Sequence, residues 1–236
     1  MASLKNWDNK TWLSSKKYIN SFNNFVLKQK KLNKNSKILD IGCGRGKILE
    51  NLTQRLKLVN KPIGIDIENH KDKSKKILFK KIDAFRFISK TKISFDLILI
   101  KQTIHLLKKN QIIKILNLCK KKLNRNGKIL VLSLDPDKNE IPTFKIMYKT
   151  LKKSLSRDNK IFEIINNTYP ELLIKNFTYP VKILKKDYLE MIKKKYISTL
   201  LNFTNNQITD GLKEIDIKYK KKLIFNDNLI CMIIKK

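Results

Sequence analysis

The sequence predicts an α/β fold with a doubly wound sheet, a closing antiparallel hairpin and a helical cap insertion. Between residues 37 and 134, strand-like and helix-like segments alternate, which is the pattern of parallel βαβ units. After residue 134 the chain becomes mostly helical, and residues 220–236 return to a strand-like pattern. These two changes of pattern predict one α/β domain that is interrupted by a helical insertion.

The first half of the chain supplies the expected sheet. Within residues 1–36, apolar residues at 12, 18, 19, 22, 25 and 26 have the spacing of an amphipathic helix. Strands are expected at 37–42, 62–67, 76–83, 95–101 and 128–134, and helices at 47–58 and 111–123. The run FDLILIK at 95–101 is almost continuously apolar, as expected for a central parallel strand that is buried on both faces.

The second half predicts the cap and the end of the sheet. Helices are expected near 143–156, 158–167, 186–201 and 205–216, with breaks at Pro142, Pro170 and Pro180. Residues 220–236 predict two strands joined by a turn at 226–228. The expected organisation is therefore an N-terminal helical lid segment at 1–36, an α/β domain at 37–134 and 220–236, and a helical cap insertion at 135–219.

The composition excludes several classes of protein. With 236 residues and 42% hydrophobic residues, the chain is long and apolar enough to bury a core. Three scattered cysteines, Cys43, Cys119 and Cys231, make neither a disulfide framework nor a CxxC metal pair, so no metal site is predicted. The N-terminal residues lack the apolar stretch of a signal peptide, and no apolar run reaches membrane-spanning length. We expect a cytoplasmic protein without a membrane partner.

The net charge of +33 invites a nucleic-acid interpretation, because lysine and arginine release counterions from phosphate. Only five of the 53 basic residues are arginine, although arginine is the side chain best suited to phosphates and guanine edges. Lysine, asparagine and isoleucine, which dominate the composition, share A/T-rich codons. Residues 1–134 carry +24 and the insertion only +5. We therefore expect nucleic acid to bind only weakly, through nonspecific charge.

The most informative run is ILDIGCGRG at 38–46, where a strand leads through a glycine-rich turn into a helix. A dinucleotide fingerprint would place its third glycine at Lys47, and no Gly-Lys-Ser/Thr follows to make a phosphate loop. Asp40 would face a pyrophosphate badly, but it suits a cationic ligand with an amino group and a sulfonium. Four of the six glycines lie in this first βαβ unit: Gly42, Gly44, Gly46 and Gly64. The pattern points to S-adenosylmethionine.

Two further acidic residues follow the next two strands. Asp66 ends the second strand, where a carboxylate can accept both ribose hydroxyls of a nucleoside. Asp83 ends the third strand, and it can accept a hydrogen bond from an adenine amino group or cap the helix that begins at Ala84. Ile67 and Phe85 are the expected apolar walls of the adenine site, and Ala84 is a further candidate cofactor contact.

The runs ILDIGCGRG, GIDI, KIDAF, FDLILIKQTIHLL and NGKILVLS are similar in order and spacing to the class I S-adenosylmethionine-dependent methyltransferases of the small-molecule type. The resemblance covers residues 37–134. It implies a Rossmann-like, seven-stranded sheet and S-adenosylmethionine as the cofactor. It also implies that Asp66 holds the ribose and Asp83 the adenine. The methionine end would then be held by Asp40 and the loop of Gly42, Cys43, Gly44 and Gly46.

The segment after the fourth strand, Lys101–Leu107, lies beneath the transferred methyl group in this family. The Asn/Asp-Pro-Pro-Tyr/Phe motif of nucleic-acid amino-methylating relatives is absent from it. His105 is the candidate catalytic base, although it also suits a helix-start residue packed under the cofactor. Lys101 is a candidate catalytic and cofactor-binding residue that could steer an anionic acceptor, or it is simply solvated.

The lid segment and the cap supply aromatic and methionine residues that could enclose an acceptor, although each also suits the core: Trp12, Tyr18, Tyr148, Tyr188, Met191 and Tyr196. The expected activity is transfer of a methyl group to oxygen, nitrogen or sulfur of a small molecule. The alternatives are an RNA methyltransferase that uses the basic surface and a non-catalytic cofactor-binding protein. The sequence predicts no oligomeric state.

Overall fold

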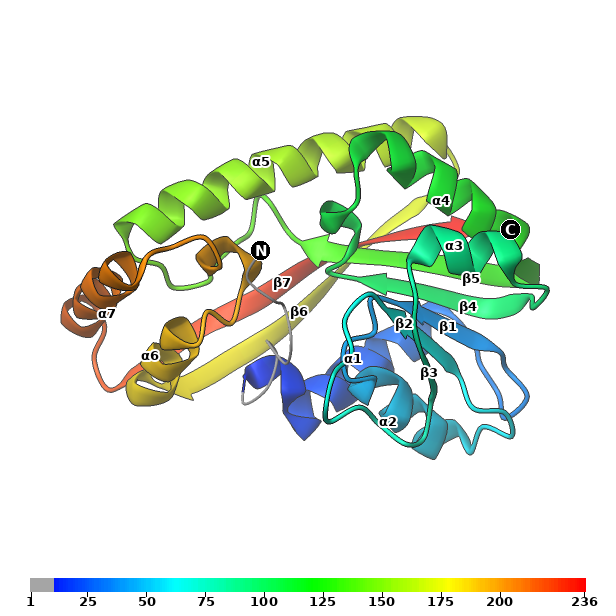
Figure 1. Cartoon of the computed structure of the whole chain (residues 1–236), viewed down its shortest axis with the longest axis horizontal. Coiled ribbons are helices and arrows are strands. Elements are labelled where there is room, and N and C mark those ends of the chain that lie inside the picture. Colours follow the sequence, from blue (N-terminus) through cyan, green and yellow to red (C-terminus); the bar gives the residue numbers. More distant parts are fainter. Residues whose placement is uncertain (1–10) are drawn as a thin grey trace.

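The computed structural model describes residues 11–236, so the first ten residues of the predicted lid segment lie outside the described residues. In this part of the chain, seven strands form one sheet in the order β3-β2-β1-β4-β5-β7-β6 (Figure 1). The strands are β1 (Ile38–Ile41), β2 (Ile63–Asp66), β3 (Leu78–Lys81), β4 (Phe95–Lys101), β5 (Leu123–Leu134), β6 (Leu173–Leu184) and β7 (Lys222–Lys235). β1 to β5 are parallel, and β7 is antiparallel to both β5 and β6. The predicted Rossmann-like sheet is confirmed.

The central strand β4 explains how the sheet is buried on both faces. Its side chains alternate between two hydrophobic clusters, so Leu97 and Leu99 join one, and Ile98 and Ile100 join the other. All four are fully buried. A strand between two covered faces must be apolar at every position, which is why the run FDLILIK identified this strand from sequence.

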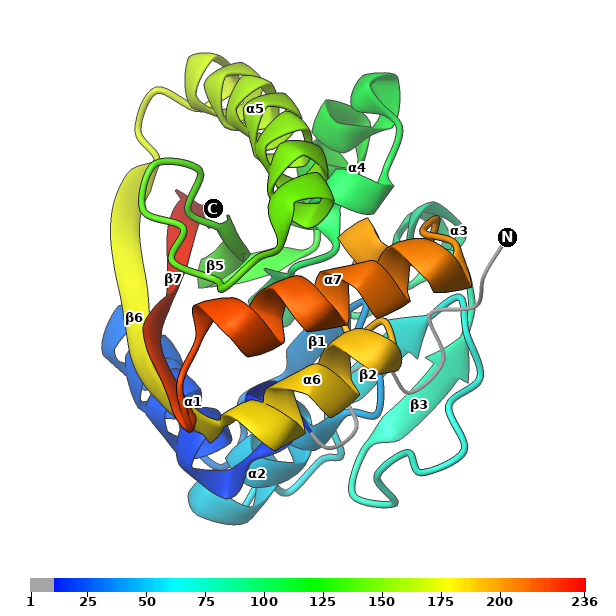
Figure 2. The same ribbon diagram turned by 90° about the vertical axis from the view of Figure 1, so that its left-hand side faces the viewer.

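Helices cover both faces of the sheet. α1 (Lys16–Gln29) and α2 (Lys47–Leu56) contribute to the cluster that contains Leu97, while α3 (Ala84–Lys90), α4 (Lys109–Lys121) and α5 (Lys145–Thr168) contribute to the cluster that contains Ile98. α6 (Lys185–Lys193) and α7 (Asn205–Lys218) lie at one end of the sheet, and Figure 2 shows them crossing in front of it. None of the helices within residues 11–236 combines the length and the apolar character that crossing a bilayer requires.

The structure differs from the predicted insertion at residues 173–184, which form strand β6 and not part of a helical cap. α5 is also one continuous helix where two were expected. Alternate residues Phe177, Tyr179, Val181 and Ile183 turn toward the sheet's core, which is the period of a strand. Pro180, which the sequence predicts as a break, lies within β6, because β6 is an edge strand where a missing N–H costs no interior hydrogen bond.

The turn predicted at 226–228 is also wrong, because β7 runs straight through these residues. Their polar side chains find partners beside the strand. The amide of Asn226 donates to Glu140 Oε2 at 2.9 Å, and the side-chain amide of Asn228 donates to the Lys138 carbonyl at 2.7 Å. The closing antiparallel pair therefore exists, but it consists of β6 and β7 and not of two halves of residues 220–236.

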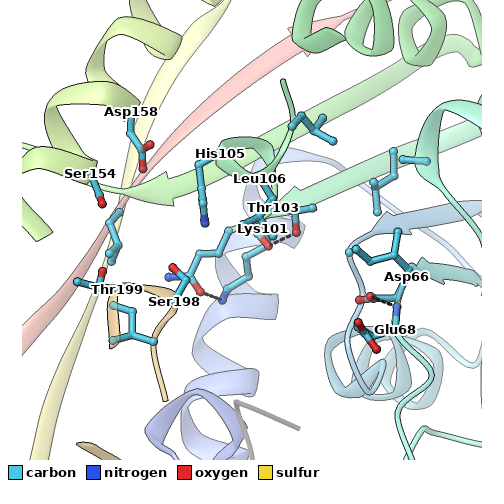
Figure 3. Close-up of a pocket in the computed structure, with 18 of the residues that line it drawn as sticks. Asp66, Glu68, Lys101, Thr103, His105, Leu106, Ser154, Asp158, Ser198 and Thr199 are labelled. Atoms are coloured by element: carbon cyan, nitrogen blue, oxygen red, sulfur yellow. Dashed lines mark hydrogen bonds between the residues drawn. The ribbon is translucent and has the colours of Figure 1, made fainter. Parts of the chain in front are cut away.

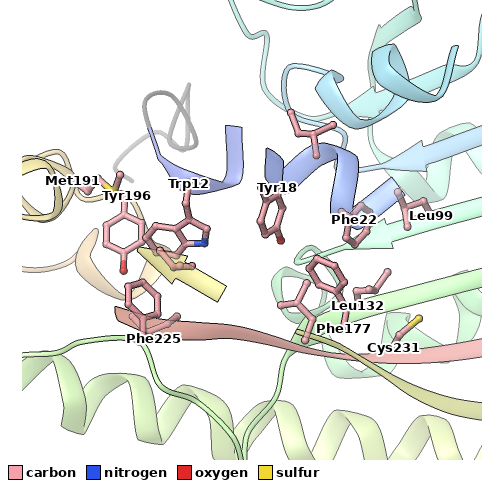
Figure 4. Packing of buried hydrophobic residues seen from close by; sticks show 14 of the residues in the cluster. Trp12, Tyr18, Phe22, Leu99, Leu132, Phe177, Met191, Tyr196, Phe225 and Cys231 are labelled. Carbon is pink, nitrogen blue, oxygen red and sulfur yellow. The ribbon is translucent and has the colours of Figure 1, made fainter. Parts of the chain in front are cut away.

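α1 is packed into the body of the protein. Tyr18 and Phe22 on its inner face are fully buried, and both rings meet Phe177 of β6, at centroid distances of 5.8 and 5.3 Å (Figure 4). The helix predicted within residues 1–36 is confirmed, and it forms part of one layer over the sheet. Its N-terminal side carries Trp12, in the short 3₁₀ turn Trp12–Ser14, toward the end of the sheet where α6 lies.

The start of α7 offers a test of helix capping. Thr204 accepts the amide of Gln207 at 3.2 Å, and the Gln207 side chain accepts the amide of Thr204 at 2.9 Å, which makes a complete capping box. We expect Thr204→Ala to lower the free energy of unfolding by about 1 kcal/mol, measured by urea denaturation. Thr204→Ser keeps the accepting oxygen and should stay within a few tenths of a kcal/mol of the unchanged protein. Equal losses in both variants would contradict the capping role.

Candidate functional site

An elongated cavity of about 370 Å³ opens at the carboxyl ends of the parallel strands. One end of it is lined by the residues that end or follow β1, β2 and β3, and the other by residues of β5, α5, β7 and the 196–199 segment. Figure 3 shows Asp66 and Glu68 at one side, Ser154, Asp158 and Thr199 at the other, and Lys101 and Thr103 between them. In open α/β sheets this edge is where ligands bind.

The glycine loop closes tightly on the end of β4. Gly42, Gly44 and Gly46 have φ angles of +75°, +54° and +72°, a region that other residues rarely adopt. A Cβ on Gly42 would lie 2.1 Å from Thr103 Oγ1, which itself donates to the Lys101 carbonyl at 3.0 Å. Any side chain at this position would therefore push the loop and the end of β4 apart. With glycine here, the backbone of residue 42 forms part of the cavity wall.

Asp66 ends β2 and lines the cavity as an ionised carboxylate. Its Oδ2 accepts the amide of Gly44 and its Oδ1 the amide of Glu68, both at 2.9 Å. Burial acts to raise the pKa of Asp66, but the hydrogen bond from His70 and those two amides outweigh burial and hold the pKa below its usual value. Asp66 thereby ties the glycine loop to β2 and presents negative charge to the cavity.

Asp83 fills one of the two roles that the sequence left open, the helix cap, and it also lies on the cavity wall. Its Oδ1 accepts the amide of Arg86 at 3.0 Å and so caps α3, while the residue also lines the cavity beside Ala84. Ile67, the first predicted wall, lines the cavity as well. Phe85, the second, does not: its side chain is 44% exposed and lies off the cavity wall. The first turn of α3 directs Ala84, and not Phe85, to the buried side.

Asp40 lies beneath the glycine loop and off the cavity wall, with only 3% of its surface exposed. Burial and the charge of Asp66 raise its pKa to about 7, and the nearby ammonium of Lys101 acts in the opposite direction. Cys43, Gly44 and Gly46 also lie off the wall, so of the predicted loop residues the structure brings only Gly42 to the cavity. The backbone of Gly42 thus faces the cavity, and the other predicted residues of this loop lie behind it.

Lys101 and His105 both line the middle of the cavity. Lys101 is held in place: its Nζ donates to Gln102 Oε1 at 3.1 Å and lies 5.3 and 5.4 Å from the ring centroids of Tyr18 and Phe22. Lys101 is therefore not one of the solvated lysines that are common on this lysine-rich chain. Burial lowers the pKa of His105; nearby Asp158 opposes this shift and Arg157 adds to it, so the imidazole is neutral near pH 7.

The six predicted acceptor contacts divide into three groups. Trp12 and Tyr196 line the cavity. Tyr18, Tyr188 and Met191 are buried off its wall, and the hydroxyl of Tyr188 donates to the Pro142 carbonyl at 2.5 Å. Tyr148 is 56% exposed and lines a separate groove with Phe144 and Ile217, so its predicted place at the site is wrong. Its position on the outer side of α5 decides this.

Sequence reasoning missed two carboxylates at the far end of the cavity, Asp158 and Asp227. Asp227 looked like a turn residue, yet it is 1% exposed within β7. Burial raises its pKa, while the charge of Lys101 and the hydrogen bond from Trp12 act to lower it. For Asp158, the sequence does contain a pattern that could have identified it. It occupies a position of the apolar face of α5 that otherwise carries Leu151, Leu155, Phe162 and Ile165, all of them buried. A charged residue at a core position indicates a cavity or a partner.

Comparison with known proteins agrees with this architecture. A family model described as a methyltransferase domain matches residues 32–205. The plantazolicin methyltransferase BpumL, solved with a pentazolic desmethylPZN analog and SAH, is 19% identical with a TM-score of 0.55 over 98% of this chain and 88% of that one. A SAM-dependent methyltransferase from Archaeoglobus fulgidus is 18% identical, with a TM-score of 0.53 over 92% and 94% of the two chains. Precorrin 8w decarboxylase from Methanobacterium thermoautotrophicum is 12% identical, with a TM-score of 0.52 over 90% and 88%. No curated protein matches the chain.

Proposed function

The chain belongs to the methyltransferase domain family as an S-adenosylmethionine-dependent enzyme, and on that premise we propose that it methylates oxygen, nitrogen or sulfur of a small molecule. The observation that carries the proposal is one cavity whose lining includes the strand ends of β1 to β3, Lys101 and Thr103, and residues of α5 and the 196–199 segment. The first end suits a nucleoside and the second suits its reaction partner. A cavity of about 370 Å³ that must hold both favours a compact acceptor over a polymer.

The residues at the first end fit the cofactor. Ionised Asp66 can accept the two ribose hydroxyls, and Asp83 keeps acceptor positions beyond its single bond to Arg86 for an adenine amino group. Gly42 has no room for a side chain beside Thr103, and its backbone on the cavity wall is available to the methionine end of the cofactor. Glu68 adds a further carboxylate to this wall. Because S-adenosylmethionine carries a sulfonium and an ammonium, an acidic wall is the electrostatic match that it needs.

The cofactor supplies an electrophilic methyl group, and the chain must align an acceptor with it and exclude water. Thr103 and the β4 end fix the glycine loop from one side, and Lys101 stands between the two ends of the cavity. Trp12, Leu134 and Tyr196 close the acceptor end with apolar surface. We propose that His105, neutral near pH 7, takes the proton that the acceptor releases.

Two measurements test this function. Calorimetry should show binding of S-adenosylmethionine and of its demethylated product, with much weaker binding of NAD. Labelled methyl should then pass from the cofactor into the small-molecule fraction of an extract of the cells that make the chain. Label that enters only RNase-sensitive material would replace the small-molecule proposal by the RNA alternative. Binding without any labelled product would leave a non-catalytic cofactor-binding protein.

We propose that the N-terminal 3₁₀ turn and the 196–200 segment close over the acceptor, as the mobile part of the predicted lid and cap. Trp12 and Tyr196 meet edge-on, with ring centroids 5.3 Å apart, and both line the cavity. Hydrogen exchange should therefore slow in both segments when the cofactor product binds, in addition to slowing in the glycine loop. A response confined to the glycine loop and Asp66, with unchanged exchange around Tyr196, would contradict the closure.

A further inference from the structure

The acceptor end of the cavity holds two carboxylates to which the proposed function gives no role. Asp227 of β7 is 1% exposed, lines the cavity, and accepts the indole N–H of Trp12 on Oδ2 at 3.1 Å. Asp158 of α5 is 6% exposed and lines the same end. Figure 3 shows its carboxylate on the same side of the pocket as Ser154, with His105 toward the middle. Trp12 and Arg157 occupy only part of these two carboxylates, and placing two acids in one cavity still needs a reason, because burying charge is costly.

The cavity reverses the charge balance of the protein. The chain has 53 basic and 20 acidic residues, but the cavity wall carries more acidic than basic side chains. The acids are Asp66, Glu68, Asp83, Asp158 and Asp227, and the bases are Lys101, Lys108 and Arg157. Hydrogen bonding to the ribose and the adenine accounts for Asp66 and Asp83 at the nucleoside end. It does not account for Asp158 and Asp227 at the other end.

The basic side chains near these two acids are already engaged. Arg157, whose side chain is 49% exposed, directs Nε and Nη2 to Asp158 Oδ1 at 3.3 and 3.1 Å. Lys101 donates to Gln102 Oε1 and lies against the rings of Tyr18 and Phe22, and its charge acts on both Asp40 and Asp227. An anionic acceptor would have to displace these interactions and sit beside two carboxylates. A cationic acceptor would add to them.

Resting on the proposed function, we propose that the methyl acceptor is an amine with an apolar body, which enters as an ammonium ion and is received by Asp227 and Asp158. Asp227 has acceptor positions beyond the hydrogen bonds from Trp12 and Tyr18, and Asp158 has them beyond those from Arg157. Burial raises the pKa of Asp227, and a bound ammonium would favour its charged form. The remaining wall of this end is largely apolar, with Trp12, Leu134, Ile141, Leu151 and Leu155. The acids also offset the repulsion between an ammonium and the cofactor's sulfonium, which would otherwise keep two cations out of one cavity.

An ammonium nitrogen has no lone pair, so it must lose a proton before it can be methylated. His105 lines the cavity and is neutral near pH 7, so its imidazole can accept that proton. The nitrogen lone pair then forms the new N–C bond, the S–C bond breaks, and its electron pair stays on sulfur. The product leaves as a methylated ammonium, and His105 returns its proton to solvent. The two carboxylates bind charge and take no part in bond making.

The test uses the full-length protein, labelled S-adenosylmethionine and an ultrafiltrate of the cells that make the chain. One portion is treated first with an N-hydroxysuccinimide acetate, which acylates amines and removes their charge. We expect this treatment to lower methyl transfer at least tenfold. Transfer that survives amine acylation, or label recovered as an O- or S-methyl compound, overturns the amine assignment and leaves the proposed function standing. No transfer from either portion, although the cofactor binds, counts against the proposed function itself.

Variants separate acceptor binding from cofactor binding. Asp227→Asn and Asp158→Asn keep the shape of the side chain, so each is expected to raise the ultrafiltrate concentration needed for half-maximal transfer at least tenfold. Calorimetry should give both variants the affinity of the unchanged protein for the demethylated cofactor product. The matched control is Asp210→Asn, which replaces an exposed carboxylate of α7 that forms an ion pair with Lys213 at 3.7 Å. If both cavity variants need the same ultrafiltrate concentration for half-maximal transfer as the unchanged protein, the proposal is overturned.

Discussion

Replacing Asp66 by alanine is expected to weaken binding of the demethylated cofactor product by about a hundredfold to ten-thousandfold in calorimetry. The carboxylate is ionised and lines the nucleoside end of the cavity. Two hydrogen bonds from ribose hydroxyls to a charged acceptor contribute about 1.5–3 kcal/mol each, and 1.4 kcal/mol is a factor of ten in affinity. The substitution also frees the amides of Gly44 and Glu68, which Asp66 now holds at 2.9 Å.

The control for this prediction is Asp72→Asn, which removes a carboxylate from an exposed position of the loop that follows β2. Its affinity for the cofactor product should match that of the unchanged protein. Circular dichroism of Asp66→Ala should show an intact fold, because the lost hydrogen bonds lie at a strand end and not in the core. A loss of less than threefold in a folded Asp66→Ala protein would show that the ribose is held elsewhere.

Asp40→Asn is expected to stabilise the protein without cofactor above pH 7 and to have little effect near pH 4. Burial raises the pKa of Asp40 from its ordinary value of 3.8 to about 7, so the folded state binds a proton that the unfolded state has lost between these values. Stability therefore falls as pH rises from about 4 to about 7. The ionised carboxylate then costs up to about 4 kcal/mol, which the neutral asparagine avoids.

Urea denaturation of both proteins at pH 4.5, 6 and 8 measures this difference, with the exposed Asp72→Asn as the control for a general charge effect. The same ionised carboxylate is useful once a cation is bound nearby. Cofactor binding should thus tighten between pH 6 and 8 in the unchanged protein and lose that pH dependence in Asp40→Asn. A stability difference that is the same at all three pH values would show that Asp40 does not titrate in this range.

The cofactor end of the site could be found from the sequence because its information is local. The glycines at 42, 44 and 46 are spaced for a turn with positive φ, and the structure has them at +75°, +54° and +72°. Asp66 ends β2 and Asp83 lies two residues past the end of β3, and carboxyl ends of parallel strands meet at one edge. Even so, sequence could not tell that Asp40 lies under the loop and off the cavity wall, since exposure depends on how the loop folds back on β4.

The parallel half of the sheet, the glycine loop and the amphipathic α1 can be predicted from sequence, because each has a period or a motif contained in a few consecutive residues. The acceptor end depends on contacts between distant parts of the chain. Asp227 becomes a cavity residue because β7 pairs with β5 and β6 from distant parts of the chain and Trp12 packs across it. Tyr148 and Tyr196 both fall in helices expected from the sequence, yet one lies on the outer side of α5 and the other on the cavity wall. Long-range strand pairing and helix packing set that difference, and local sequence carries no direct record of either.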